Sequence, residues 1–240
     1  MKQGAVEAAA LAVERHFTSC RIAILGGSAA EGTHGAYSDL DLVILDDSAR
    51  SAYRRTFREN EWLVEAFVLS TEAYRAYSIR SLQEALPSLQ RMIAQGIVIR
   101  DDGTAAVLRA EAEADLACGP FPWSDEEREY ARYRITEYAD DLLAARSRAE
   151  GIFTMQQLLG RLSEFILRTQ GSWLGEGKWC SRAVRACDAD LHEKLISASE
   201  EYYRTDAAKP LVALAERILA PSGGFLREGF WEEVSFGEED

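Results

Sequence analysis

The sequence predicts an α+β domain with a small mixed β-sheet, followed by an all-α helical bundle domain. Short apolar runs of the kind that form strands occur only in the first half of the chain. The second half shows apolar residues at helical spacing instead. The segment "GPFPW" at residues 119–123 separates the two halves, so we place the domains at 1–120 and 121–240.

The first half contains a helix, then strands and helices in alternation. We expect a helix over 1–17, and the polar segment 48–60 is interpreted as helix or loop. A further helical pattern over 81–96 contains Pro87, where we expect a break or a kink, because proline inside a helix removes a backbone hydrogen bond. Strands are predicted at 20–27, 39–45, 61–70 and 97–103, with a last helix over 104–118.

The second half begins with a helix whose start is marked by Ser124 and Glu127, the spacing of a capping box. This helix is expected to run to about Arg148. A second helix over 154–171 and further helices between 179 and 220, broken near Asp188 and Asp206, complete the bundle. The acidic and aromatic tail, 227–240, is compatible with docking on the bundle or with a loose end.

Charge and composition exclude several classes of protein. The formal net charge of −13 is spread over both halves, which makes long nucleic acid a poor partner and would attract a cationic small molecule. No apolar run approaches the length of a membrane span. The N-terminus has the pattern of an amphipathic helix and not of a signal peptide, so we expect a cytoplasmic protein. The four cysteines form no CxxC pair, which argues against a zinc site or a disulfide framework.

Two aspartates stand where a strand should enter the core. On a strand Asp39 and Asp41 point to one face, with Leu40 and Leu42 on the other. Two carboxylates this close repel each other, and their burial is costly. A Mg²⁺ ion removes both difficulties, since it prefers oxygen ligands and completes its shell with water and substrate phosphate.

Glu65 is a third acid in an apolar strand, "WLVEAFVL". If this strand pairs beside the first, Glu65 completes a triad of carboxylates that can hold two metal ions for displacement at a phosphate. The alternative is a structural ion pair between Glu65 and an arginine. Gly26 and Gly27 end a strand, and Ser28 follows them in a turn. The backbone N–H groups and the hydroxyl of this turn suit an anion such as phosphate. The turn is neither a P-loop nor a GxGxxG fingerprint.

Gly27-Ser28, Gly32, Ser38-Asp39 and Asp41, with Glu65 on a later strand, resemble the nucleotidyltransferase superfamily typified by DNA polymerase β. The helical second half is similar to the small-molecule branch of that superfamily, which includes the aminoglycoside and lincosamide nucleotidyltransferases. The resemblance covers roughly residues 22–68. A "GKW" element at 177–179 is similar to one in related bacterial proteins.

The resemblance implies that ATP or another nucleoside triphosphate binds as co-substrate with Mg²⁺. It implies that Asp39, Asp41 and Glu65 are catalytic and hold metal, that Gly27, Ser28 and Ser38 bind the nucleotide, and that Glu65 can take the proton of the acceptor hydroxyl. Relatives often carry an arginine just after the glycine–serine pair, where this chain has Ala29, Ala30 and Glu31. A basic residue elsewhere then has to hold the phosphates.

Three residues of the second half are further candidates. Lys178 follows Gly177 and suits an anion such as the nucleotide, although a structural use is as compatible with the sequence. Asp140 and Asp141 can belong to a solvated face with local ion pairs. They can also bind a cationic acceptor, or supply the general base in place of Glu65.

The sequence therefore predicts transfer of a nucleoside monophosphate, AMP from ATP in the first instance, to a hydroxyl of a small acceptor. An aminoglycoside-type antibiotic is one specific form of that acceptor, which would make the chain an antibiotic-resistance enzyme. The alternatives are a nucleotidyltransferase that acts on a protein partner, and a nucleotide-binding regulatory protein with reduced catalysis. The oligomeric state stays open.

Overall fold

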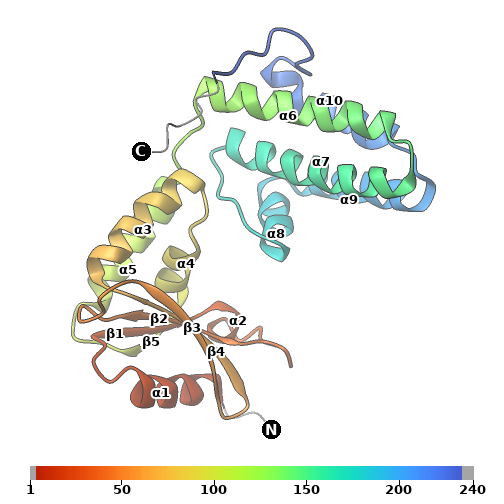
Figure 1. Cartoon of the computed structure of the whole chain (residues 1–240). Helices are drawn as coiled ribbons and strands as arrows, with labels where there is room; N and C mark the ends of the chain where they lie inside the picture. The colour runs from red at the N-terminus through yellow and green to blue at the C-terminus, as the bar shows by residue number, and fades with distance from the viewer. Residues whose placement is uncertain (1–3, 234–240) are drawn as a thin grey trace, which may run out of the picture. The chain divides into compact units, whose positions relative to one another are not determined.

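The computed structural model describes residues 4–233, which divide into two compact units between Pro120 and Phe121. The first unit combines a five-stranded sheet with helices, and the second is a run of helices (Figure 1). The predicted fold class is confirmed.

The sheet of the first unit is mixed and has the strand order β3-β4-β2-β1-β5. The central strand β2 pairs antiparallel with β1 and parallel with β4, while β3 and β5 pair antiparallel at the two edges. The strands span Ile22–Gly26 (β1), Leu40–Leu45 (β2), Tyr53–Glu59 (β3), Trp62–Leu69 (β4) and Ile97–Arg100 (β5).

Helices cover both faces of this sheet (Figure 1). The helix α1 (Ala5–His16) buries a stripe of small residues, Ala5, Ala8, Ala9, Ala12 and Val13, against one face, and this spacing is that of an amphipathic helix. The helices α3 (Thr71–Glu84), α4 (Ser88–Gln95) and α5 (Ala105–Cys118) cover the other face. The short α2 (Gly27–Ala30) follows β1 directly. The sheet is thus the middle layer of three, and its apolar residues form two cores.

The interpretation of residues 48–60 as helix or loop was wrong, because Tyr53–Glu59 forms β3. This strand lies at the sheet edge, and its side chains are exposed as far as Arg58, except for the half-buried Phe57. An edge strand that faces water carries charged residues and shows little apolar signal. A two-residue turn with Asn60 at φ 53° joins β3 to β4.

The helical prediction around Pro87 was confirmed in part. Pro87 stands at the N-terminus of α4, so the predicted break is present. The helix before it begins much earlier than predicted, because the Ser70 hydroxyl accepts a hydrogen bond from Ala73 N and caps α3. Residues 71–80 carry a weak apolar pattern, which explains why periodicity did not reveal them.

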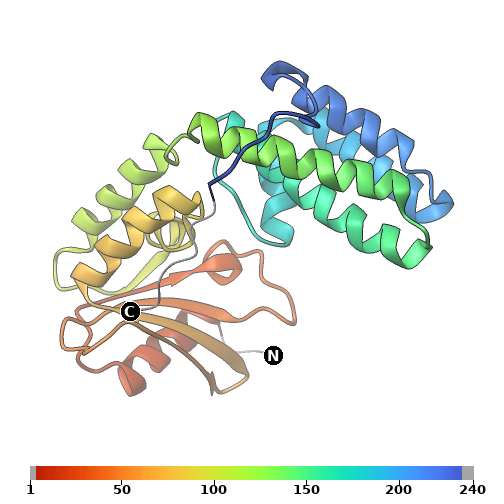
Figure 2. The ribbon, with the colours of Figure 1, turned by 45° about the horizontal axis from the view of Figure 1, so that its top comes forward.

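The second unit contains α6 (Asp125–Ala144), α7 (Arg148–Thr169), α8 (Lys178–Cys187), α9 (Ala189–Thr205) and α10 (Lys209–Leu219), followed by the 3-10 turn η1 (Ala220–Ser222). The predicted capping box at Ser124 and Glu127 is present. A break at 145–147 separates α6 from α7, which lie side by side (Figure 2). Asp188 caps α9, and Asp206 ends it in a left-handed conformation. Within residues 4–233 no helix combines the length and apolar character needed to cross a bilayer.

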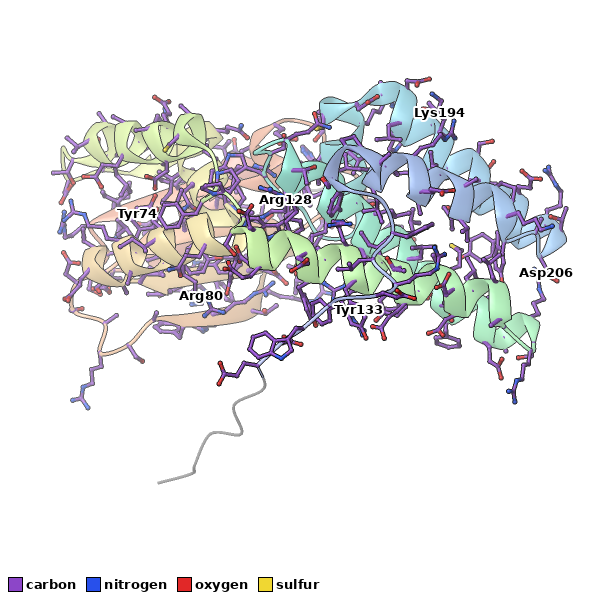
Figure 3. All side chains as sticks on the ribbon, turned by 90° about the horizontal axis from the view of Figure 1, so that it is seen from above. Tyr74, Arg80, Arg128, Tyr133, Lys194 and Asp206 are labelled. Atoms are coloured by element: carbon purple, nitrogen blue, oxygen red, sulfur yellow. The ribbon has the colours of Figure 1, made fainter. Side chains whose placement is uncertain are left out.

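The segment after η1 docks along α6. Leu226 N donates to Thr136 Oγ1 at 2.9 Å, and Phe230 stacks on Tyr133 with a centroid distance of 4.0 Å, at the labelled position in Figure 3. Of the two possibilities for the tail, docking is therefore observed as far as Phe230, whereas Trp231 is exposed. Residues 234–240 lie outside the described part of the chain.

Candidate active site

Asp39 and Asp41 lie at the entrance of β2. Asp39 precedes the strand, Asp41 is its second residue, and both side chains are partly buried. Leu40 and Leu42 point to the opposite face, where they are fully buried in the core beneath α1. The alternation inferred from the sequence is therefore present. The two carboxylates share their sheet face with Val43 and Leu45, which belong to the second core.

The parallel pairing of β2 with β4 brings Glu65 to the same place. Asp41 and Glu65 are direct neighbours across the two strands. One carboxylate oxygen from each of Asp39, Asp41 and Glu65 lies within 4.8 Å of the other two. The structure thus assembles the predicted triad. Such a cluster of like charges calls for positive charge nearby.

Gly27 makes room for this cluster. Its φ of +63° is one that L side chains rarely adopt, and a Cβ at this position would lie 2.1 Å from Asp41 Oδ2. Because Gly26 pairs with Asp41 across β1 and β2, the backbone after β1 runs directly past the carboxylate. The glycine therefore keeps a cradle open beside the three acids. Hard carboxylate oxygens in such a cradle fit a divalent cation such as Mg²⁺.

Ser28 and Ser38 are also brought together. Ser28 Oγ donates to Ser38 Oγ at 3.3 Å, and Gly35 N donates to Ser38 Oγ at 2.9 Å. The first bond joins the two ends of the segment that leads from α2 to β2, and the second lies within it. Two hydroxyls and the backbone of Gly27 thus lie next to the acids, an arrangement that can donate hydrogen bonds to phosphate oxygens.

Arg54 is a residue of this site that the sequence reasoning missed. Its Nη2 donates to Glu65 Oε2, and its guanidinium lies 4.8 Å from the centre of the Phe67 ring. The hydrogen bond to Glu65, with the nearby charges of Glu65, Asp41 and Asp39, raises the pKa of Arg54 above its usual value. The ion pair with an arginine, the structural alternative for Glu65, therefore coexists with the carboxylate cluster. An alternating interpretation of 53–59 would have placed Arg54 and Thr56 on one face of a strand, and the pairing of β3 with β4 puts Glu65 on that face.

The candidates from the second half lie in the helical unit. Lys178 is the first residue of α8, and its Nζ lies 5.8 Å from the centre of the Trp179 ring. Arg227 donates twice to Asp140, at 2.8 and 3.0 Å, so Asp140 forms a structural ion pair. Asp141 is exposed. A contact between any of these residues and substrate stays a prediction.

The helical unit also contains a cavity of about 770 Å³ between α7, α9 and α10. Its floor is apolar, formed by side chains such as Phe165 and Leu214, and the basic residues Arg128, Lys194 and Arg217 line it. Two of these are already paired, Arg128 with Asp125 and Lys194 with Asp190. The lining does not resemble a site for a polycation.

Residues 14–93 match the family model of the nucleotidyltransferase domain. This segment contains the carboxylate triad and the glycine–serine turn. A comparison with curated proteins finds no match. Among solved structures, the chain is similar to a nucleotidyltransferase-like protein from Exiguobacterium sibiricum 255-15, with a TM-score of 0.50 and 11% sequence identity over 89% of this chain and 75% of that one. At this identity the likeness shows a shared fold alone. The family match, on the segment that carries the triad, supports nucleotidyl transfer as the activity of the chain.

Proposed function

We propose that this protein transfers a nucleoside monophosphate from a nucleoside triphosphate, ATP in the first instance, to a hydroxyl of a small molecule with the help of Mg²⁺. The observation that carries the proposal is the cluster of Asp39, Asp41 and Glu65, whose carboxylate oxygens lie within 4.8 Å of one another beside Gly27. It lies inside the segment that matches the nucleotidyltransferase family.

The positions of these residues support the following roles. Asp39, Asp41 and Glu65 would hold Mg²⁺, which when bound supplies the positive charge that offsets the triphosphate. The Gly27 backbone and the hydroxyls of Ser28 and Ser38 donate to phosphate oxygens. The acceptor hydroxyl forms a bond to the α-phosphorus, and the bond from that phosphorus to the bridging oxygen breaks, releasing pyrophosphate. Glu65 takes the hydroxyl proton.

The helical unit is proposed to choose the acceptor. A cationic, hydroxyl-rich molecule such as an aminoglycoside agrees with the net charge of −13. The basic lining of the α7–α9–α10 cavity suits an anionic group better. The acceptor panel should therefore contain cationic, neutral and anionic alcohols.

The test is pyrophosphate release from each of the four nucleoside triphosphates with Mg²⁺ and this panel, with mass spectrometry of the products. We expect release with at least one acceptor, and an acceptor heavier by one nucleoside monophosphate. The double variant Asp39→Asn/Asp41→Asn is the matched control, because it keeps side-chain shape and removes two charges. Release at equal rates from both proteins would refute the proposal.

A second candidate is a nucleotide-binding protein with reduced catalysis. It is favoured by the loop 27–38, which contains no lysine or arginine and carries Glu31. In that case isothermal titration calorimetry would detect binding of Mg²⁺ and nucleotide while no acceptor is modified. A protein acceptor would instead show transfer in a lysate from which small molecules had been removed.

A further inference from the structure

The side chain of Arg54 contacts the carboxylate cluster through its guanidinium group. Its Nη2 donates to Glu65, and its guanidinium lies over the ring of Phe67. The side chain comes from the edge strand β3 and is 58% exposed, against 21% for Glu65. It can therefore leave Glu65 without opening the core.

The positive charge on the phosphate side has to come from outside the glycine–serine loop. Residues 27–38 read "GSAAEGTHGAYS", with no lysine or arginine and with Glu31 as a further negative charge. A triphosphate that lies over Gly27 and Ser28 therefore meets hydroxyls and N–H groups in this loop and no cation. Arg54 lies at the neighbouring Glu65 and carries the charge that the loop lacks.

We propose that Arg54 is an exchangeable counter-ion, which neutralises Glu65 in the free protein and turns to the phosphate groups of the nucleotide when a divalent cation takes its place. The inference rests on the proposed function, because it requires a metal ion and a nucleoside triphosphate at these residues. It assigns the phosphate-binding cation of this site to the β3 edge strand.

This exchange predicts opposite effects of Arg54 on the affinity for the metal ion and on the affinity for the nucleotide. A guanidinium at Glu65 repels an incoming divalent cation and competes with it for the same carboxylate. Once the cation is bound, the local charge no longer holds Arg54, whereas phosphate oxygens offer the paired acceptor geometry that a guanidinium prefers. Removal of Arg54 should therefore strengthen the binding of metal alone and weaken the binding of metal with nucleotide.

The experiment measures two dissociation constants of the 240-residue chain, one for the metal ion alone and one for the nucleotide with the metal ion. Binding of Mn²⁺ alone is followed by electron paramagnetic resonance, and binding of a non-hydrolysable ATP analogue with Mg²⁺ by isothermal titration calorimetry. The variants are Arg54→Gln, Arg54→Lys and the control Arg55→Gln. Arg55 is the next residue on β3, is also exposed, and lies over Phe57, away from Glu65.

For Arg54→Gln we expect Mn²⁺ affinity to rise by about threefold to tenfold and nucleotide affinity to fall by about as much, since the pair is largely exposed. Arg54→Lys should keep Mn²⁺ affinity near that of the wild type and lose part of the nucleotide affinity, because lysine lacks the planar fork. It also keeps the test valid if Arg54→Gln does not fold. Arg55→Gln should move neither constant appreciably.

Three results would each overturn the role of Arg54 and leave the proposed function standing. The first is unchanged or weaker Mn²⁺ binding in Arg54→Gln, and the second is unchanged nucleotide binding in that variant. The third is the same pair of changes in Arg55→Gln. The proposed function itself would be overturned if the wild type did not bind Mn²⁺, or if the double variant Asp39→Asn/Asp41→Asn bound Mn²⁺ as tightly as the wild type. The two failures are thus distinguishable.

Discussion

Two glutamates of the β3–β4 hairpin have opposite surroundings. Glu59, at the end of β3, has a side chain that is 5% exposed, and it accepts from Arg15 Nη1 at 2.8 Å with His16 Nε2 at 3.1 Å. Glu65, on β4, is 21% exposed and lies within a cluster with Asp39 and Asp41. The first belongs to the sheet face under α1 and the second to the other face.

If the proposed function holds, the difference separates a carboxylate that supports folding from carboxylates that support chemistry. Arg15 pairs with Glu59 and a ring nitrogen of His16 lies within hydrogen-bond distance of it, so the burial of Glu59 is compensated in the free protein. The clustered acids repel one another, and their arrangement gains its full compensation only when positive charge arrives with a ligand. Substitution of Glu59 should therefore lower stability and leave activity unchanged, whereas substitution in the carboxylate cluster should lower activity and leave stability equal or higher.

The largest effect is expected for Asp39→Asn and Asp41→Asn, each alone. Both should lower the rate of pyrophosphate release by at least about a thousandfold, because they remove charged ligands of the proposed metal site. Thermal unfolding should show an equal or higher melting temperature, since a repulsive charge is lost. A variant that keeps its activity within about tenfold, or that unfolds at a clearly lower temperature, would place that aspartate with Glu59 as a structural residue.

Gly27→Ala should come next, because it disturbs the cluster through the backbone. The new Cβ would meet Asp41 Oδ2, and the φ of +63° would be strained. We expect a loss of about a hundredfold in rate from the displaced carboxylate and of about 1–3 kcal/mol in stability.

Gly32→Ala is the matched control for this change. Its φ is +69°, but a Cβ there would have no atom within 4 Å. It should show a stability loss of about 1 kcal/mol with the rate nearly unchanged. Equal rates in the two variants, measured by pyrophosphate release, would mean that strain and not the Asp41 contact matters at Gly27.

Glu59→Gln should show the reverse pattern. The amide keeps the shape but loses the charge that holds Arg15 and His16, so we expect the free energy of unfolding to fall by about 1–3 kcal/mol, less than for a fully buried pair because Arg15 is 56% exposed. Urea denaturation measures the loss, and the rate per folded molecule should not change. Glu61→Gln in the adjacent exposed turn is the control. A reduced rate in folded Glu59→Gln would break the division between the two glutamates.

The triad could be predicted from the sequence because its three acids stand in or next to apolar runs. Acids inside apolar runs are rare enough to stand out, and the period of two fixed their common face. The fold class followed from patterns of similar strength. Arg54 escaped because edge strand β3 is exposed, so that neither burial nor an apolar run marked it as a strand. Its partner Glu65 is known only once the pairing of β3 with β4 is known, and that pairing is a tertiary fact.

The smallest effect on stability is expected for Asp102, a carboxylate that has an arginine and a hydroxyl as partners and is exposed to water. Thr104 and Arg21 donate to Asp102, and these hydrogen bonds lower its pKa to about 2, from a usual value of 3.8. Because the folded value is the lower one, the contribution of Asp102 to stability is present above about pH 4 and is lost as the pH falls toward 2. Asp102→Asn should therefore melt slightly below the wild type at pH 7, and this gap should close in scanning calorimetry between pH 4 and 2. A gap that stays constant down to pH 2 would show that the charge of Asp102 contributes nothing. Partners alone would then not identify a structural carboxylate, and burial, as at Glu59, would be the deciding feature.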